Sequence, residues 1–405
     1  MVNVQPFRGL RYDPDVVGDW GAVLGPPYDI VDAAQTAALK ASSPHQIAHI
    51  ETAGGDEIVD AAQTLRDWRA AGTIVRDQAP SYYLHEHRFG GATERRMRWA
   101  IFGAVELAPW GDGVMAHERT MPGPRATRTA LRSAVGADVS PLMAFVPDSD
   151  GVLAELIELA GQLPLLCQGT DPMGDTHTLR RIDGANTVMR IGDAFANDTI
   201  YMADGHHRYE SALDAIDDRP GSGRVLMGIV CANDPGLVVG ATHRIVHSDI
   251  PASLVAQLGR GFRIDETDAS ALNELLTEGS SLIGLITRDG AWLLEPTDAA
   301  MRSMPEGIPD AWRTLAPAIL QHAILEPILG IDADVLAGGQ AVTYTHHLDE
   351  LTAAVASGAA SAGFVLPAPT LQDVIDTADV GSFMPQKSTY FVPKLPTGLV
   401  LHGLD

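Results

Sequence analysis

Cysteine, lysine and long apolar runs are all scarce in this chain of 405 residues. Only Cys167 and Cys231 occur, and neither has a CxxC partner, which argues against a disulfide framework and a zinc knuckle. No run of about 18 apolar residues is present, and the first residues lack a basic segment followed by an apolar core. We therefore expect a soluble, cytoplasmic protein with no membrane partner.

Positive charge is also scarce. Lysine occurs at only three positions, and the formal net charge is −24. An acidic surface repels nucleic acid and anionic membranes, so neither is an expected partner. Short basic segments therefore stand out, and two of the three lysines, Lys387 and Lys394, fall in one C-terminal segment.

The order of apolar patterns predicts an α+β fold. Asp29 or Asp32 can cap a helix that runs to Lys40, and residues 81–89 and 95–107 have the pattern of a β-hairpin. Strand, helix and strand patterns follow between residues 198 and 232, and a long helix is expected around 311–329. We expect a mixed-sheet domain over residues 1–250 and a smaller α/β region over 251–405.

The segment 201–216, YMADGHHRYESALDAI, places a polar cluster where an apolar strand pattern turns into a helical one. Gly205 allows a tight turn, and the N–H groups of the following helix start form an anion site together with His206, His207 and Arg208. The alternative is that Asp204 is only an N-cap and the histidines are solvated. On the anion-site interpretation, we expect Arg208 to contribute more to ligand binding than to stability.

The segment 117–133, HERTMPGPRATRTALRS, is the second candidate. Four arginines and no acid occur between residues 119 and 137, and if 125–132 is helical, Arg125, Arg128 and Arg132 share one face. A solvated basic face is the simpler interpretation. His117 and Glu118 favour a functional one, because a carboxylate beside guanidinium groups can deprotonate a hydroxyl next to a bound phosphate.

Other polar groups are less specific. Lys387 precedes Ser388 and Thr389, which can bind phosphate, but the glycine-rich loop of a P-loop is absent. The pair His243 and Arg244 lies at the end of a strand pattern. A further pair, His85 and His87, alternates along another strand, and an exposed strand face is a simpler explanation than half of a metal site.

Several motifs together resemble a large bacterial and archaeal family known as domain of unknown function 1015. They are FRGLRY, PPYDIV, HERTMPGPRATR, ADGHHRYESA, THRIV and MPQKSTYFVPKLPTGLV, in that order along the chain. The shorter DGHHR segment is similar to the ParB/sulfiredoxin-like superfamily, which includes free-serine kinases. This similarity implies that Gly205, His206, His207 and Arg208 contact a nucleotide or another phosphorylated small molecule.

These observations lead to the hypothesis of a small-metabolite phosphotransferase, most concretely a free-serine kinase-like enzyme that uses Mg²⁺ and a nucleotide or pyrophosphate. Glu118 is the expected base, with Asp204 and His117 as further catalytic candidates. The expected phosphate-binding residues are those of the DGHHR segment, together with Arg119, Arg128, His243, Arg244, Lys387, Ser388 and Thr389. We expect the HERT, DGHHR and QKST segments to share one site.

Two alternatives remain open from the sequence. The same anion pocket suits a nucleotide or metabolite sensor without chemistry. A metal-dependent phosphatase or hydrolase requires His117, His206 and Glu210 as ligands, and the i, i+4 spacing of His206 and Glu210 is its only support.

Overall fold

The structure, a computed structural model, describes residues 2–90, 95–119 and 122–405, and the chain divides into two compact units. Unit 1 comprises Met1–Ala116, Thr120–Val238 and Pro393–Asp405. Unit 2 comprises His117–Arg119 and Val239–Val392. The last residues of the chain therefore belong to the same unit as the first ones.

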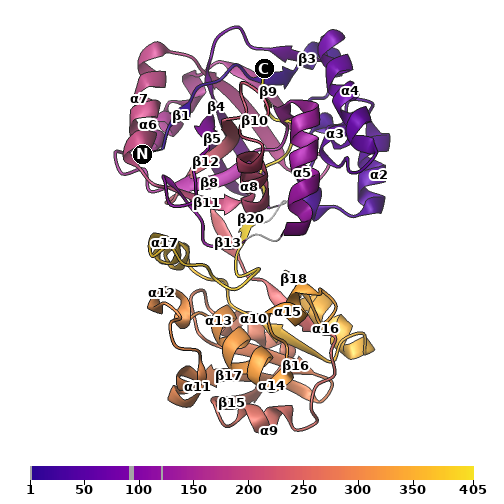
Figure 1. Cartoon of the computed structure of the whole chain (residues 1–405), viewed down its shortest axis with the longest axis vertical. Coiled ribbons are helices and arrows are strands. Elements are labelled where there is room, and N and C mark those ends of the chain that lie inside the picture. The colour runs from indigo at the N-terminus through magenta and orange to yellow at the C-terminus, as the bar shows by residue number, and fades with distance from the viewer. Residues whose placement is uncertain (1, 91–94, 120–121) are drawn as a thin grey trace. The chain divides into compact units, whose positions relative to one another are not determined.

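Unit 1 is built on a nine-stranded mixed sheet (Figure 1). In spatial order the main path contains β6 (Val114–Met115), β11 (Ile200–Asp204), β8 (Leu142–Val146), β12 (Arg224–Cys231), β5 (Arg96–Glu106), β4 (Tyr82–Phe89), β10 (Thr176–Ile182) and β9 (Leu165–Thr170). A short strand, β1 (Val4–Gln5), pairs with β5. The pairs β6–β11 and β8–β12 are parallel and the others antiparallel, so the fold is α+β with a mixed sheet.

Helices cover both faces of this sheet, with α6 and α7 on one side and α3, α4 and α5 on the other (Figure 1). The α-helices of unit 1 are α1 (Pro14–Val17), α2 (Ala33–Ser42), α3 (Ala48–Glu51), α4 (Glu57–Ala70), α5 (Pro122–Val135), α6 (Val152–Glu158), α7 (Ala185–Asn197) and α8 (His206–Asp214). Asp32 and Gln35 form a capping box at the start of α2, so of the two expected caps Asp32 is the one used.

The main core lies between the sheet and the helices α6, α7 and α8. Alternate residues of β4, such as Tyr82 and Leu84, face this core, where Phe195 of α7 and Tyr209 of α8 are also buried. The opposite face of β4 carries Tyr83, His85 and His87, because successive side chains of a strand point to opposite faces. Strand β11 ends at Asp204, and α8 begins two residues later at His206.

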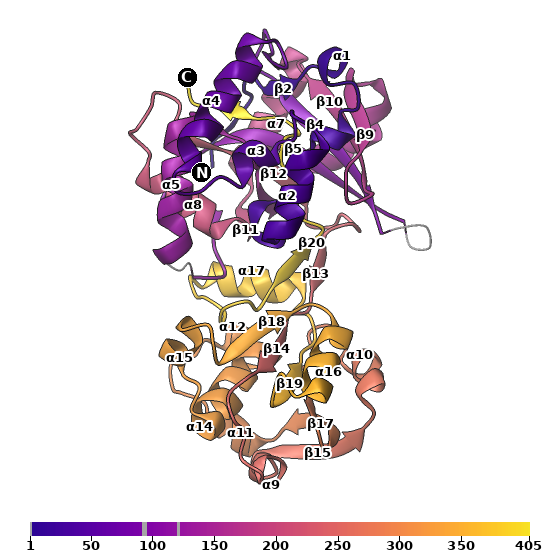
Figure 2. The same ribbon diagram turned by 90° about the vertical axis from the view of Figure 1, so that its right-hand side faces the viewer.

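Unit 2 contains a six-stranded antiparallel sheet, of which β14, β18 and β19 are visible in Figure 2. Its order is β15 (Phe262–Thr267), β17 (Gly290–Pro296), β16 (Ile283–Thr287), β19 (Ala362–Val365), β14 (His243–Val246) and β18 (Val342–Thr345). The chain enters this unit within β13 (Val238–Gly240) and leaves it after β20 (Tyr390–Val392). Further α-helices are α9 (Leu254–Leu258), α10 (Leu272–Leu275), α11 (Asp298–Ser303), α15 (Ala333–Ala337), α16 (Leu348–Ser357) and α17 (Leu371–Asp379).

The long helix expected around 311–329 is interrupted. The structure has α12 (Asp310–Arg313), α13 (Ala316–Ile319), a π-helical stretch at Leu320–Leu325 and α14 (Glu326–Leu329). Pro317 and Pro327 lie in the first turns of α13 and α14, where a missing N–H costs least. Among the residues that the structure describes, no helix is long and apolar enough to cross a membrane.

Candidate functional site

The junction between β11 and α8 depends on a glycine. Gly205 has φ +102°, and a Cβ atom at this position would lie 2.6 Å from Cδ2 of Leu142. Glycine is therefore required twice, for its left-handed backbone and for the close approach of β8. It is also the N-cap residue of α8 and has no side chain to cap the first turn, which leaves a helix start of the kind that binds anions.

Next to this turn, two acids and two cations form a chain of charges. The Nζ atom of Lys394 lies 2.7 Å from Oδ2 of Asp29 and 2.7 Å from Oδ1 of Asp204. The other oxygen of Asp204 lies 2.8 Å from Nη2 of Arg208. Burial alone would raise the pKa of Asp204, but Lys394 and Arg208 outweigh it and hold that pKa far below its ordinary value.

Arg208 is anchored in unit 1. Its Nη1 donates to Oγ of Ser140 at 2.7 Å and to the carbonyl oxygen of Pro141 at 2.8 Å, in addition to the ion pair with Asp204. The side chain is 12% exposed. The expectation that Arg208 contributes more to ligand binding than to stability stays a prediction, and the three protein groups bound by its guanidinium give it a structural role as well.

A second arginine, Arg128 of α5, lies in the same charged neighbourhood. Its guanidinium donates to the carbonyl oxygens of Glu51 at 2.7 Å and Ala53 at 3.0 Å, and its Cζ lies 4.1 Å from the ring centroid of Tyr28. The Glu51 side chain is almost fully buried, and its Oε1 lies 4.0 Å from Nη1 of Arg128. Burial raises the pKa of Glu51, although Arg128 and Arg208 oppose the shift.

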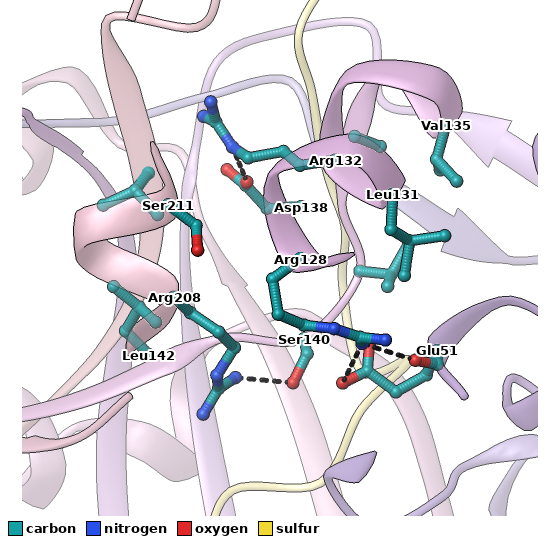
Figure 3. A pocket seen from close by; sticks show the side chains of 13 residues that line it. Glu51, Arg128, Leu131, Arg132, Val135, Asp138, Ser140, Leu142, Arg208 and Ser211 are labelled. Atoms are coloured by element: carbon teal, nitrogen blue, oxygen red, sulfur yellow. Dashed lines mark hydrogen bonds and ion pairs between the residues drawn. The ribbon is translucent and has the colours of Figure 1, made fainter. Parts of the chain in front are cut away.

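A small cavity lies between α5 and α8, and it is bounded by Glu51, Arg128, Ser140 and Arg208 on its polar side (Figure 3). Its volume is about 50 Å³. Leucine and valine side chains form the apolar remainder, namely Leu131, Val135, Val139, Leu142 and Val225. Nucleotide-sized ligands occupy pockets of about 300 Å³ or more, so this cavity suits only a small molecule or one end of a larger one.

Unit 2 holds the residues of the HERT and QKST segments. Oε1 of Glu118 accepts a hydrogen bond from the backbone N–H of Lys387 at 2.7 Å, and His117 Nε2 lies 2.8 Å from Oγ1 of Thr389. The backbone of Lys387 has φ +57°, an uncommon conformation for a residue with a side chain. These contacts bring the two segments together, as expected, although Thr120 of HERT lies outside the described residues.

The other predicted residues of unit 2 lie near these segments along the chain or in space. Arg244 is buried, donates to the carbonyl oxygen of Gln386 at 3.1 Å and lies 5.3 Å from the ring of Tyr344. His243 accepts a hydrogen bond from the backbone N–H of Leu366 at 3.1 Å, and burial lowers its pKa to about 4. Arg119 is exposed and lies 5.3 Å from the ring of Phe383, and Ser388 is buried.

The predicted site residues are thus distributed between the units. Unit 1 contains Asp204, Gly205, His206, His207, Arg208 and Arg128, and unit 2 contains His117, Glu118, Arg119, His243, Arg244, Lys387, Ser388 and Thr389. Sequence reasoning missed Glu51 and the ion pairs that Lys394 forms with Asp29 and Asp204. The rarity of lysine and the PPYDIV motif were available signals for Lys394 and Asp29, whereas nothing in the local sequence marks Glu51.

The expectation of an exposed strand face around His85 and His87 is wrong. Both side chains are buried, together with His177 of the neighbouring strand β10. His85 Nε2 lies 3.1 Å from Nδ1 of His177, and Oδ2 of Asp171 and of Asp175 lie within hydrogen-bond distance of His177 and His87. His85 and His177 are therefore hydrogen-bonded to each other, and His87 packs against His177 with the ring centroids 4.5 Å apart. The described residues contain no group of three or more ligands arranged for a metal ion.

The chain belongs to the family described as "Protein of unknown function (DUF1015)", whose sequence profile matches residues 4–316. A comparison with curated proteins found no match. Among solved structures, the chain is similar to a free serine kinase in complex with AMP, with 14% identity, a TM-score of 0.42, and coverage of 76% of this chain and 91% of that one.

Two further solved structures have comparable coverage. A conserved hypothetical protein from Pyrococcus furiosus is 14% identical, with a TM-score of 0.39 over 74% of this chain and 93% of that one. SbnI from Staphylococcus aureus, truncated at its C-terminus, is 9% identical, with a TM-score of 0.36 over 73% and 85% of the two chains. Likeness of this degree defines no ligand for this chain.

Proposed function

We propose that the protein is a phosphotransferase that acts on a small hydroxylated metabolite, in the manner of a free-serine kinase. The observation that carries this proposal is the array Asp29–Lys394–Asp204–Arg208 beside the glycine turn that begins α8. A helix start with an adjacent lysine and arginine supplies the donors that a phosphoryl group needs. Asp204, the carboxylate between those two cations, has further lone pairs that can accept a hydrogen bond from a hydroxyl group.

The proposed reaction moves one phosphoryl group. The acceptor hydroxyl oxygen forms a bond to phosphorus, the bond from phosphorus to the leaving phosphate oxygen breaks, and the hydroxyl proton passes to a carboxylate. Asp204 is the candidate for this carboxylate in unit 1 and Glu118 the candidate in unit 2. Because Lys394 and Arg208 keep the pKa of Asp204 low, Asp204 serves to orient the hydroxyl and accepts its proton only as the bond to phosphorus forms.

The described side chains do not form a site for the expected magnesium ion from protein groups alone. Both oxygens of Asp204 are paired with cations, and the described residues contain no group of three or more candidate metal ligands. We therefore derive no step through a metal. The phosphatase alternative loses support from Glu210, whose oxygens pair with Arg125 at 2.9 Å and accept from Nε1 of Trp110 at 3.0 Å.

The test is a ligand-stabilisation screen followed by a transfer assay. We expect ADP, ATP or pyrophosphate to raise the melting temperature of the purified protein, because a ligand that binds only the native state stabilises it by mass action. L-serine with the stabilising donor should then yield a phosphorylated product. Stabilisation without turnover of any hydroxylated substrate would favour the sensor, and the absence of both effects would refute the proposal.

A further inference from the structure

Glu51 is a buried carboxylate with an unfilled hydrogen-bond acceptor. Its side chain is 3% exposed, and no described group donates a hydrogen bond to its Oε1 atom. A buried polar atom without a partner costs about 1–3 kcal/mol, and more for a charged group. Such a cost is uncommon unless another molecule supplies the missing donor.

The neighbouring arginine does not fill this role. Arg128 directs Nη1 and Nη2 to the backbone carbonyls of Glu51 and Ala53, and its guanidinium stacks on Tyr28. The carboxylate of Glu51 is left 4.0 Å from Nη1, beyond hydrogen-bond distance. Arg128 therefore fixes the backbone around Glu51 and partly offsets its charge without satisfying Oε1.

The position of Glu51 connects the cavity to the proposed reaction site. Glu51 lines the same cavity as Ser140 and Arg208 (Figure 3). Arg208 in turn binds Asp204 beside the start of α8. A molecule that donates a hydrogen bond to Glu51 would lie on the cavity side of Arg208. The volume of about 50 Å³ admits only a few non-hydrogen atoms.

We propose that Glu51 binds the phosphoryl acceptor through a hydrogen-bond donor of that acceptor, a hydroxyl or ammonium group, and so determines its specificity. The inference rests on the proposed phosphotransferase function. It identifies the acceptor as a small polar molecule with a donor group at one end. The cavity excludes bulky substituents at that end, so specificity for size and for a donor arises at the same place.

The first experiment separates a ligand-binding carboxylate from a structural one. Asp138 provides the matched control, because it lines the same cavity but is paired with Arg132 at 2.7 Å and with His402 at 3.0 Å. We expect Glu51→Gln to keep or raise the melting temperature of the ligand-free protein at pH 7, by up to about 3 °C, since it removes a buried charge. Asp138→Asn should lower it. A loss in Glu51→Gln as large as in Asp138→Asn would overturn the proposal.

The second experiment measures binding by calorimetry, using L-serine, L-alanine and 3-hydroxypropanoate as probes in the presence of ADP. L-alanine lacks the hydroxyl and 3-hydroxypropanoate lacks the ammonium, so the probe that retains affinity identifies the group that donates to Glu51. We expect Glu51→Gln to weaken the binding of this probe by about tenfold or more, which corresponds to the loss of one charge-assisted hydrogen bond. The affinity for ADP should stay within about twofold.

The outcomes distinguish the two proposals. Equal probe affinity in wild type and Glu51→Gln, or no binding of any probe to the wild type, would overturn the role of Glu51. Binding of a probe that depends on Glu51, with no binding of nucleotide or pyrophosphate, would support the role of Glu51 and refute the phosphotransferase proposal alone.

Discussion

At the scale of single residues, Lys394 is a cation that forms ion pairs with two carboxylates at once. Its side chain is 9% exposed and lies between Asp29 and Asp204. Burial would lower its pKa, but the two carboxylates outweigh burial and raise it. The side chain of Asp204 is 19% exposed and that of Asp29 37%, so loss of the lysine would cost most at Asp204, which would keep only Arg208 as a partner.

The first prediction is that Lys394→Met lowers the free energy of unfolding by about 3–5 kcal/mol, the range for removal of one partner from a buried ion pair. Lys387→Met is the control. Because Lys387 is exposed, this substitution should change the free energy of unfolding by no more than about 0.5 kcal/mol. Chemical denaturation of both variants measures the difference. Equal stability of the two variants would contradict the assignment of Lys394 as the central cation.

The second prediction concerns Arg208. Because its guanidinium binds Asp204, Ser140 and Pro141, Arg208→Ala should cost about 3 kcal/mol or more of unfolding free energy as well as phosphate-ligand affinity. Arg208→Lys keeps the charge but not the fork, and should recover part of the stability. Unchanged melting temperature in Arg208→Ala would return this residue to a purely ligand-facing role.

The third prediction tests the catalytic carboxylate. Glu118→Gln should leave stability nearly unchanged, because a glutamine oxygen can still accept from the Lys387 N–H. If Glu118 is the base, kcat should fall by about a hundredfold or more while donor binding persists. Asp204→Asn is the comparison, and loss of turnover in that variant with full activity in Glu118→Gln would assign the role to Asp204.

At the scale of elements, the turn between β11 and α8 could be located from the sequence, since an apolar strand pattern, a glycine and a helical pattern follow one another. Helix α5 also carries the predicted arginine row. The partners of that row could not be predicted, because Arg125 pairs with Glu210 and Asp214, and Arg132 with Asp138. Contacts between distant segments decide whether an arginine faces solvent, a ligand or the protein.

The strand β4 shows a second limit. Its alternation indicated that His85 and His87 share one face, and the register of β4 against β10 places His87 opposite His177. Alternation along a strand shows which residues share a face of the sheet. It does not show that the polar face is buried as well, which happens when both faces of the sheet are covered. The long helix expected at 311–329 failed for a local reason, since its two prolines each begin a new helix.

The fourth prediction concerns the glycine turn. Gly205→Ala should destabilise unit 1 by about 1–3 kcal/mol, because the backbone is left-handed and the new Cβ would lie 2.6 Å from Leu142. Gly192→Ala in α7 is the control, since its Cβ would lie 3.6 Å from the nearest atom, the Tyr82 hydroxyl oxygen, and alanine favours helix. Thermal denaturation should separate the two variants in opposite directions.

At the scale of the whole molecule, a fall in pH changes the stability that buried carboxylates and buried histidines contribute. Carboxylates with lowered pKa values, such as Asp138 at about 2 and Asp171, contribute stability that is lost only when the pH falls below their ordinary range. As the pH falls, buried neutral histidines reduce stability at a higher pH than these carboxylates do. Burial, helped by His177 and Arg98 and opposed by Asp175, lowers the pKa of His87 to about 4. Burial and the same neighbouring charges lower the pKa of His85 well below its ordinary value.

The fifth prediction follows from the sign of these shifts. A histidine whose pKa is lower in the folded chain than in the unfolded chain takes up its proton more readily on unfolding, so stability falls as the pH drops from about 6.5 towards 4. For His87 alone the loss between pH 7 and pH 5 is about 2 kcal/mol.

In His87→Gln, the amide can still donate to Asp175 and accept from Arg98 but cannot titrate. Denaturation at both pH values should therefore show a smaller acid loss in His87→Gln than in wild type, whereas His247→Gln, at an exposed position, should keep the wild-type loss. If His87→Gln loses as much stability as wild type, acid sensitivity in this range arises from groups other than His87.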